Sequence, residues 1–321
     1  MVTTSDSAWT ADDVPELDDR TVVVTGANTG LGYEATRVFA RKGADVVMAC
    51  RSTDRGEAAR RELRDGDLRG SLDVAALDLA DLDSVRSFAD EFGATHDGLD
   101  VLCNNAGVMA IPRRETADGF ETQFGVNHLG HFALTGLLLD SLRAADGEAR
   151  VVTQSSGVHE RGEIDFADLQ GEDDYDEWDA YAQSKLANVL FAYELQRRLD
   201  RAGADVASVA CHPGYADTDL QRRGPEMAGS RLRLVAMKAA NAAFAQPAEA
   251  GALPMLYAAT APAIEGGEYV GPGGLFDMRG APTVQQSSDR SYDRRRAERL
   301  WSVSEELTGV SYDLEAAATA E

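Results

Sequence analysis

The sequence predicts one α/β domain, in which a doubly wound and mostly parallel sheet of about seven strands carries helices on both faces. Two observations lead to this fold class. Short apolar runs alternate with longer amphipathic segments along the chain, which favours right-handed crossovers between parallel strands. A glycine-rich turn, Gly26 to Gly32, joins the first apolar run to the first amphipathic segment, as in sheets that bind a ligand at a strand–helix turn.

The predicted strands are short runs of apolar, often β-branched residues. The first, Thr21–Thr25, has the sequence TVVVT and is expected to be buried on both faces of the sheet. Further strands are predicted at Asp45–Ala49, Leu72–Leu77, Leu99–Cys103, Arg150–Gln154 and Asp205–Ala210.

The predicted helices lie between these strands. Gly43 ends the first of them, because glycine disfavours continuation of a helix. The segment Phe124–Leu142 is largely apolar and is expected to form one long buried helix. The remaining helices are predicted at Tyr33–Lys42, Ser52–Arg64, Asp81–Phe92 and from Tyr181 to about Arg201.

No internal repeat and no linker divides the chain, so residues 20–281 are predicted to be one domain. Residues 1–19 form an acidic extension before it, without the basic start and apolar run of a secretory signal. Residues 282–321 are expected to form a polar helix and an acidic tail. We expect no membrane-spanning segment, because no apolar run approaches the ~18 residues that a span requires.

Charge narrows the range of partners. The chain has 55 Asp and Glu residues against 31 Lys and Arg, a net charge of -24 and only three lysines. So negative a protein is not expected to bind nucleic acid or an anionic membrane. This composition is typical of a protein from a salt-rich cytoplasm, although an acidic protein from an ordinary cytoplasm fits it as well.

Three cysteines, Cys50, Cys103 and Cys211, each end an apolar run and lie far apart in the sequence. Their spacing matches neither a zinc site nor a disulfide framework, so they are expected to be buried, reduced thiols. The histidines likewise lack metal-ligand spacing, and no metal site is predicted. We therefore expect a cytoplasmic protein without a metal.

Tyr181 and Lys185 stand four residues apart in a YAQSK sequence. On a helix they share one face, where a lysine ammonium favours the phenolate and lowers the pKa of the tyrosine. Such a pair can serve as an acid/base, but two residues at this spacing are also common on helix surfaces. The glycine turn has a similar ambiguity, because TGxxxGxG can cradle a pyrophosphate or simply allow a tight turn.

Eight motifs in order resolve both ambiguities, because together they resemble the short-chain dehydrogenase/reductase superfamily and, within it, its retinol-dehydrogenase and WW-domain-oxidoreductase-like branch. The resemblance extends from about Arg20 to Val270 and implies a Rossmann-type fold. The motifs are TGANTGLG at 25–32, ACRS at 49–52, LDL at 77–79, NNAG at 104–107, VNHLGHF at 126–132, SS at 155–156, YAQSK at 181–185 and HPG at 212–214.

The resemblance implies a nicotinamide cofactor and residues that bind it. The glycine turn would line the pyrophosphate, Asp78 and Leu79 would hold the adenine, and Lys185 would hold the nicotinamide ribose. The PGxxxT pattern would seat the carboxamide. The full expected set is Gly26, Asn28, Thr29, Gly30, Leu31, Gly32, Arg51, Asp78, Leu79, Asn105, Ala106, Gly107, Tyr181, Lys185, Pro213, Gly214 and Thr218.

The same resemblance implies the catalytic residues Asn127, Ser156, Tyr181 and Lys185. Ser156 would orient and polarise the substrate oxygen, and Tyr181 would act as acid/base. Asn127 would anchor a water that links Lys185 to solvent. Hydride transfer leaves negative charge on the carbonyl oxygen, so two hydroxyl donors aimed at that oxygen suit the reaction.

The choice between NAD and NADP depends on Cys50 and Arg51. NAD-dependent enzymes place an acidic residue at the end of the second strand, whereas the 2′-phosphate of NADP requires a cation. An uncharged cysteine occupies the acidic position here and an arginine follows it. We therefore expect NADP(H) as the cofactor.

Two further segments bear on the branch of the family and on substrate specificity. Ser156 and Tyr181 are 25 positions apart, and the acidic insert between them contains Tyr175, which has no lysine four residues later. Substrate specificity is expected in the segment from Tyr215 to Gln246, where an apolar stretch at 232–244 suits an apolar alcohol or carbonyl, or merely the packing face of a covering helix.

The sequence therefore predicts an NADP(H)-dependent oxidoreductase that interconverts an alcohol and an aldehyde or ketone. A homodimer or a homotetramer is compatible with the sequence, which does not decide the oligomeric state. A non-catalytic, cofactor-sensing regulator on the same fold is the alternative, although such proteins can lose the Tyr or Lys that this chain keeps. A sugar-nucleotide epimerase is less favoured, since its TGxxGxxG spacing is absent.

Overall fold

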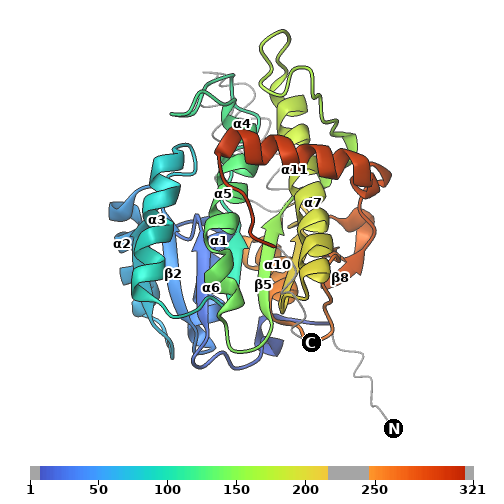
Figure 1. The fold of residues 1–321 in the computed structure, drawn as a ribbon. Helices are drawn as coiled ribbons and strands as arrows, with labels where there is room; N and C mark the ends of the chain where they lie inside the picture. The colour runs from blue at the N-terminus through green and yellow to red at the C-terminus, as the bar shows by residue number, and fades with distance from the viewer. Residues whose placement is uncertain (1–7, 216–245, 315–321) are drawn as a thin grey trace, which may run out of the picture.

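A computed structural model describes residues 8–215 and 246–314. The described residues form one eight-stranded sheet with helices on both faces, as Figure 1 shows. The predicted fold class, a doubly wound α/β sheet, is confirmed. The sheet has one strand more than predicted, because β8 follows the last parallel strand and pairs with it in the antiparallel direction.

The strands lie in the order β3-β2-β1-β4-β5-β6-β7-β8. All pairs are parallel except β7–β8, and the chain reverses its winding direction between β1 and β4. Such a switch point opens a crevice beyond the carboxyl ends of the two strands. The strands span β1 Thr21–Thr25, β2 Asp45–Cys50, β3 Leu72–Ala76, β4 Val101–Asn104, β5 Ala149–Gln154, β6 Val206–Cys211, β7 Tyr269–Pro272 and β8 Pro282–Gln285.

Two hydrophobic cores, one on each face of the sheet, hold the layers together. Helices α1 and α10 pack against one another on one face, while α3, α5 and α7 cover the other (Figure 1). The α-helices span α1 Gly30–Arg41, α2 Thr53–Arg64, α3 Leu82–Thr95, α4 Thr122–Phe124, α5 Gly130–Leu137, α6 Leu139–Arg143, α7 Glu177–Ala202, α10 Ala248–Thr260 and α11 Arg294–Thr308.

The segment predicted as one helix over Phe124–Leu142 is divided in the structure. A π-helical turn, η2 Gly125–Leu129, separates α4 from α5, and a break at Leu138 separates α5 from α6. A π turn widens the helix locally and is frequent at functional sites. Apolar periodicity does not reveal it, because every residue from Phe124 to Leu129 except the half-exposed Val126 is buried. Four further short turns are η1 Ala11–Asp13, η3 Gly157–Arg161, η4 Leu275–Asp277 and η5 Asp289–Tyr292.

The C-terminal segment is part of the packed structure. β8 begins at Pro282, so the sheet continues past residue 281, the predicted end of the catalytic domain. Helix α11 lies across α7, where Trp301 is 2% exposed and its ring stacks on Phe191. Among the described helices, none combines the length and apolar character needed to cross a membrane. All three cysteines are free and buried.

Candidate active site

The glycine turn begins where β1 ends at the carboxyl edge of the sheet. Gly26 and Gly30 have φ values of +68° and +56°, a region that side chains disfavour, so these positions require glycine. Gly32 serves another purpose. A Cβ there would lie 2.5 Å from the Gly26 carbonyl oxygen and 2.6 Å from Asn105 Nδ2, so its absence lets α1 pack closely on the turn.

Thr25, beneath this turn, forms hydrogen bonds to several neighbouring residues. Its hydroxyl accepts the backbone N–H groups of Asn105 and Ala106, each at 2.9 Å, and lies 3.0 Å from His131 Nε2. The Asn105 side chain returns a bond from Nδ2 to the Thr25 carbonyl oxygen at 2.8 Å. These bonds tie the NNAG loop after β4 to the end of β1, so Asn105 stabilises the junction of the two strands.

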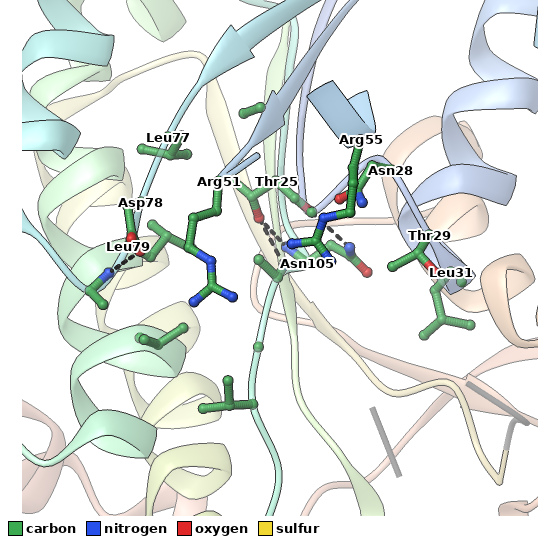
Figure 2. Close-up of a pocket in the computed structure, with 18 of the residues that line it drawn as sticks. Thr25, Asn28, Thr29, Leu31, Arg51, Arg55, Leu77, Asp78, Leu79 and Asn105 are labelled. Carbon is green, nitrogen blue, oxygen red and sulfur yellow. Dashed lines mark hydrogen bonds between the residues drawn. The ribbon is translucent and has the colours of Figure 1, made fainter. Parts of the chain in front are cut away.

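A cavity lies over the switch point between β1 and β4, and Figure 2 shows the side chains around it. Most residues predicted to bind the cofactor line it, namely Gly26, Asn28, Thr29, Gly30, Leu31, Arg51, Asp78, Leu79, Asn105, Ala106 and Gly107. The lining residues outside the expected cofactor-binding set are Thr25, Ala49, Arg55, Leu77, Ala80, Val108, Thr122 and Val126. Gly32, Tyr181, Lys185, Pro213 and Gly214 are not among its lining residues.

This cavity suits a dinucleotide. Its glycine turn leads directly into the N-terminus of α1, where backbone N–H groups favour a bound anion. Apolar side chains of Leu77 and Leu79 form a wall that suits a flat base. The buried hydroxyl oxygen of Thr122 has no hydrogen-bond partner among the described residues, so the cavity also retains unused polar capacity.

Two arginines supply positive charge to the cavity. Arg51 follows β2 and Arg55 lies one turn into α2, and Figure 2 shows both side chains extending into the cavity. Within the described part of the chain, neither guanidinium group has an ion pair or a hydrogen bond. Cys50, at the position where NAD-dependent enzymes carry an acid, is fully buried and its thiol pKa is raised by burial to about 11.

Ser156 and Tyr181, two of the predicted catalytic residues, lie near the carboxyl ends of β5 and β6. Ser156 caps the short turn η3, where its hydroxyl accepts the Val158 N–H at 3.3 Å. Tyr181 lies in the second turn of α7, which Asp176 caps by accepting the N–H groups of Trp178 and Asp179. The Ser156 side chain lowers the pKa of the Tyr181 phenol, which places the two hydroxyl groups near each other, and only 4% of Tyr181 is exposed.

Lys185 lies below Tyr181, with its Nζ 5.7 Å from the centre of the Tyr181 ring. The ammonium donates to the Gln154 carbonyl oxygen at 3.1 Å. Burial lowers the pKa of Lys185 to about 8. The sequence predicts that Lys185 lowers the pKa of Tyr181, but burial raises the pKa of that phenol to about 12, against a smaller lowering by Ser156. Desolvation therefore dominates the pKa of this phenol.

Asn127 lies in the π turn and clamps the loop that follows β4. Its Nδ2 donates to the Val108 carbonyl oxygen and to Ser184 Oγ, both at 2.9 Å, and its Oδ1 accepts the Val108 N–H at 2.8 Å. Both amide hydrogens are thus donated to protein atoms. The side chain is placed to hold the wall of the site, and the predicted water-anchoring role stays a prediction.

Tyr175, which lacks the lysine of a catalytic pair, has a structural role. Its hydroxyl donates to the Ile111 carbonyl oxygen at 2.9 Å, lies 3.0 Å from Glu121 Oε1 and accepts a bond from Gln123 Nε2 at 2.9 Å. Gln123 Oε1 in turn accepts the N–H of Ala110 at 2.8 Å, a residue with φ of +46°. The acidic insert is therefore anchored to the same loop that Asn127 holds.

The HPG motif follows β6 and places Gly214 at φ of +65°. Pro213 and Gly214 lie in this turn, and the Pro213 carbonyl oxygen accepts a bond from Gln246 Nε2 at 2.7 Å. Thr218 and the predicted apolar cover at 232–244 lie outside the described residues. No cluster of potential metal ligands occurs in the parts of the chain that the structure describes.

A doubly wound sheet with a glycine-lined cavity at its switch point, beside Ser156 and the buried Tyr181 and Lys185, defines an oxidoreductase of the nucleotide-cofactor class. The chain belongs to the short-chain dehydrogenase/reductase family, since the family model described as short chain dehydrogenase matches residues 20–228. Its retinol-dehydrogenase-like character is also confirmed. Human retinol dehydrogenase 12 is 42% identical over 300 residues, which cover 93% of this chain and 89% of that protein.

Further relatives agree with this assignment. Polyprenol dehydrogenase from Mus musculus is 43% identical over 300 residues, covering 92% of this chain and 86% of that protein. A solved structure of an uncharacterised protein from Mycobacterium paratuberculosis is 44% identical, covers 95% of this chain and 99% of its own, and superimposes with a TM-score of 0.78.

A second solved structure was determined with bound NADP at low occupancy. It comes from Beutenbergia cavernae and is described as a candidate NAD(P) dependent gluconate 5-dehydrogenase. It is 29% identical, with a TM-score of 0.58 over 76% of this chain and 91% of that one.

Proposed function

We propose that this protein is an NADP(H)-dependent oxidoreductase that interconverts an apolar alcohol and the corresponding aldehyde or ketone, with Tyr181 as acid/base. The observation that carries the proposal is the buried Tyr181 phenol, whose pKa Ser156 lowers, with Lys185 one helical turn away and its Nζ 5.7 Å from the centre of the Tyr181 ring. This set lies at the same edge of the sheet as the glycine-lined cavity. A regulator that only senses the cofactor has no need of it.

The chain's own residues divide the work on the substrate. Ser156 and Tyr181 both present a hydroxyl to the oxygen of a carbonyl, where negative charge develops during reduction. With its pKa at about 12, Tyr181 keeps its proton at neutral pH and can donate it to that oxygen. NADPH held in the glycine-lined cavity would supply the hydride for the reduction. Lys185 holds a positive charge beneath the phenol up to its pKa of about 8.

The preference for NADP(H) is supported by the charges at the end of β2. The 2′-phosphate requires cations, and Arg51 and Arg55 extend into the cavity without a protein partner among the described residues. Cys50 offers no carboxylate to the ribose hydroxyls that NAD presents there. The bound NADP in the structure from Beutenbergia cavernae is in keeping with this preference.

An apolar substrate is supported by the names of the relatives and by one side chain. Retinol and polyprenol, in the names of two relatives, are apolar isoprenoid alcohols. In this chain Trp178 is 44% exposed. Its ring packs edge-to-face with the Tyr181 ring, with the two ring centroids 6.2 Å apart. A half-exposed indole beside the proposed proton donor suits an apolar substrate.

The proposal is tested by NADPH oxidation over a panel of apolar and polar aldehydes and ketones in molar KCl. We expect turnover of apolar carbonyls, and Tyr181→Phe should lower kcat by about 10²-fold or more, the usual contribution of a general acid. NADPH binding should persist, because the phenol acts on the substrate. Lys185→Met should lower kcat and weaken NADPH binding. Tyr257→Phe serves as control, because it removes a hydroxyl beside Trp9, far from the site. Substantial turnover by Tyr181→Phe would contradict the mechanism.

A further inference from the structure

The segment that follows β7 returns to the site through residues 282–292, here called the C-terminal brace, which comprises β8 and η5. The brace bonds to two turns that the proposed function places beside the reaction. One is the turn at 156–162 after β5, and the other is the turn at 212–214 after β6. A buried histidine mediates each connection, His159 with 1% exposure and His212 with 4%.

His159 connects the brace to Ser156. Its Nε2 lies 3.0 Å from the backbone nitrogen of Ser288, and a backbone N–H can only donate, so Nε2 is the acceptor. The proton of the neutral ring is then on Nδ1, which donates to the Ser156 carbonyl oxygen at 2.7 Å. Arg290 of the brace fixes the other end of the same turn by donating to the Gly162 carbonyl oxygen at 2.8 Å.

His212 connects the brace to the HPG turn, with the opposite tautomer. Its Nδ1 accepts the Gly214 N–H at 3.3 Å, so the proton is on Nε2, which donates to Gln285 Oε1 at 3.0 Å. Gln285 is held by its own donation to the Pro272 carbonyl oxygen at 2.7 Å. A Cβ at Gly271 would lie 1.9 Å from His212 Nε2, so glycine is required where this pair crosses β7.

Tyr269 joins the two histidines into one buried row. Its ring stacks on His212 at 5.3 Å with an angle of 9°, and its hydroxyl lies 3.3 Å from His159 Nδ1. Burial lowers the pKa of both histidines, which keeps both rings neutral near pH 7. Each nitrogen of each ring therefore has a fixed role as donor or acceptor.

We infer that His159 and His212 are positioning residues, through which the C-terminal brace fixes the orientation of Ser156 and of the Pro213–Gly214 turn. The inference rests on the proposed function, because Ser156 must orient the substrate and the turn must seat the nicotinamide for their positions to matter. It assigns a role to a segment whose sequence shows no catalytic motif.

Ser288 allows a test that touches neither substrate nor cofactor. Its φ is -62°, which proline adopts, so Ser288→Pro removes the N–H that fixes the His159 tautomer. Ser288→Ala keeps that N–H and removes only a hydroxyl that has no partner among the described residues. Ser288→Pro should lower kcat by about tenfold, since small misplacements at a reacting centre have effects of this size or larger. Its Kd for NADPH and the kcat of Ser288→Ala should stay near the wild-type values.

The HPG connection is tested separately by Gln285→Met, which removes the acceptor of His212 Nε2–H. NADPH affinity should fall several-fold while kcat at saturating NADPH is largely kept. Tyr312→Phe is the matched control, because it also removes a buried hydrogen bond of the C-terminal segment, the one to the Phe132 carbonyl oxygen at 2.6 Å. It should lower the Tm without changing NADPH affinity.

A readout independent of turnover is the imidazole ¹⁵N spectrum of the wild-type protein near pH 7. We expect the Nδ1–H tautomer for His159 and the Nε2–H tautomer for His212, and mixed tautomers for His159 in Ser288→Pro. The reverse tautomers, or an active Ser288→Pro variant with wild-type kcat, would overturn the inference. A wild-type protein without carbonyl turnover would overturn the proposed function instead, and the tautomers would then decide whether the brace holds the two turns.

Discussion

The chemistry of single residues depends on their surroundings more than on their spacing. Four-residue spacing places Tyr181 and Lys185 on one face of α7, but it carries no information on how much water reaches them. Both side chains are buried, so desolvation raises the pKa of the phenol and lowers that of the amine. The sequence therefore identifies the pair and predicts the wrong direction for the pKa of Tyr181.

Cofactor preference is a question of two guanidinium groups. Arg51 was identifiable from its place after the second strand. Arg55 lines the cavity because α2 begins at Thr53 and its first turn directs the Arg55 side chain toward the cavity. We predict that Arg51→Gln and Arg55→Gln each weaken NADPH binding by about tenfold or more, because each charge-assisted hydrogen bond contributes ~1.5–3 kcal/mol. Fluorescence titration with NADPH and NADH would measure the ratio of affinities.

NADH binding should change little in both variants, because NADH has no 2′-phosphate. Arg41→Gln, at the last residue of α1 and outside the lining of this cavity, is the matched control for loss of a surface charge. An unchanged NADPH-to-NADH ratio in both arginine variants would mean that another cation reads the phosphate.

At the scale of elements, six of the strands were predictable because most strands buried in a parallel sheet are short, largely apolar runs. Each predicted strand agrees with the structure to within a few residues. The π turn and β8 were not predictable. The π turn lies in a segment that is buried on almost every side, so burial shows no helical periodicity there, and β8, with the sequence PTVQ, is short and half exposed at the sheet edge.

The π turn and α5 bring two histidines into the core, which leads to a prediction about acid. His128 and His131 are each 1% exposed, and burial lowers their pKa values to about 3 and about 4. Above pH ~6.5 both are neutral in the folded and unfolded chains. As the pH falls below that value, the unfolded chain binds protons that the folded chain rejects, so stability is lost down to the folded pKa.

Between pH 6.5 and 5 each of these histidines should cost about 2 kcal/mol of unfolding free energy. We predict a lower urea midpoint at pH 5 than at pH 7, measured in molar KCl, and a smaller difference in His128→Gln. Glu121 opposes the trend, because burial raises the pKa of its carboxyl and its protonation therefore favours the folded chain. Equal midpoints at pH 5 and 7 would show that the buried rings accept protons in the folded state.

At the scale of the whole molecule, the net charge of -24 is a feature that the proposed reaction does not explain. Part of it is concentrated in the acidic insert, where Asp165, Asp168, Asp174, Asp176 and Asp179 line one hollow. Because Tyr175 anchors the insert to Ile111 and Glu121, these charges cannot spread apart as they would on a free loop. Low salt should therefore strain the insert and, through Tyr175, the loop beside the site.

We predict that Tm and activity both rise from dilute buffer into molar KCl. The Debye length falls from ~30 Å at 0.01 M to ~3 Å at 1 M salt, so most of the repulsion between surface carboxylates should be screened by then. Sucrose at matched osmolality is the control, because excluded osmolytes favour compact states without screening charge. If charge screening is the cause, a few tenths of a molar KCl should raise Tm and activity more than sucrose does. At these concentrations the exclusion of solute from the protein surface has little effect. A protein whose Tm and activity are the same in dilute buffer and molar KCl is not adapted to salt, and the catalytic assignment would stand unchanged.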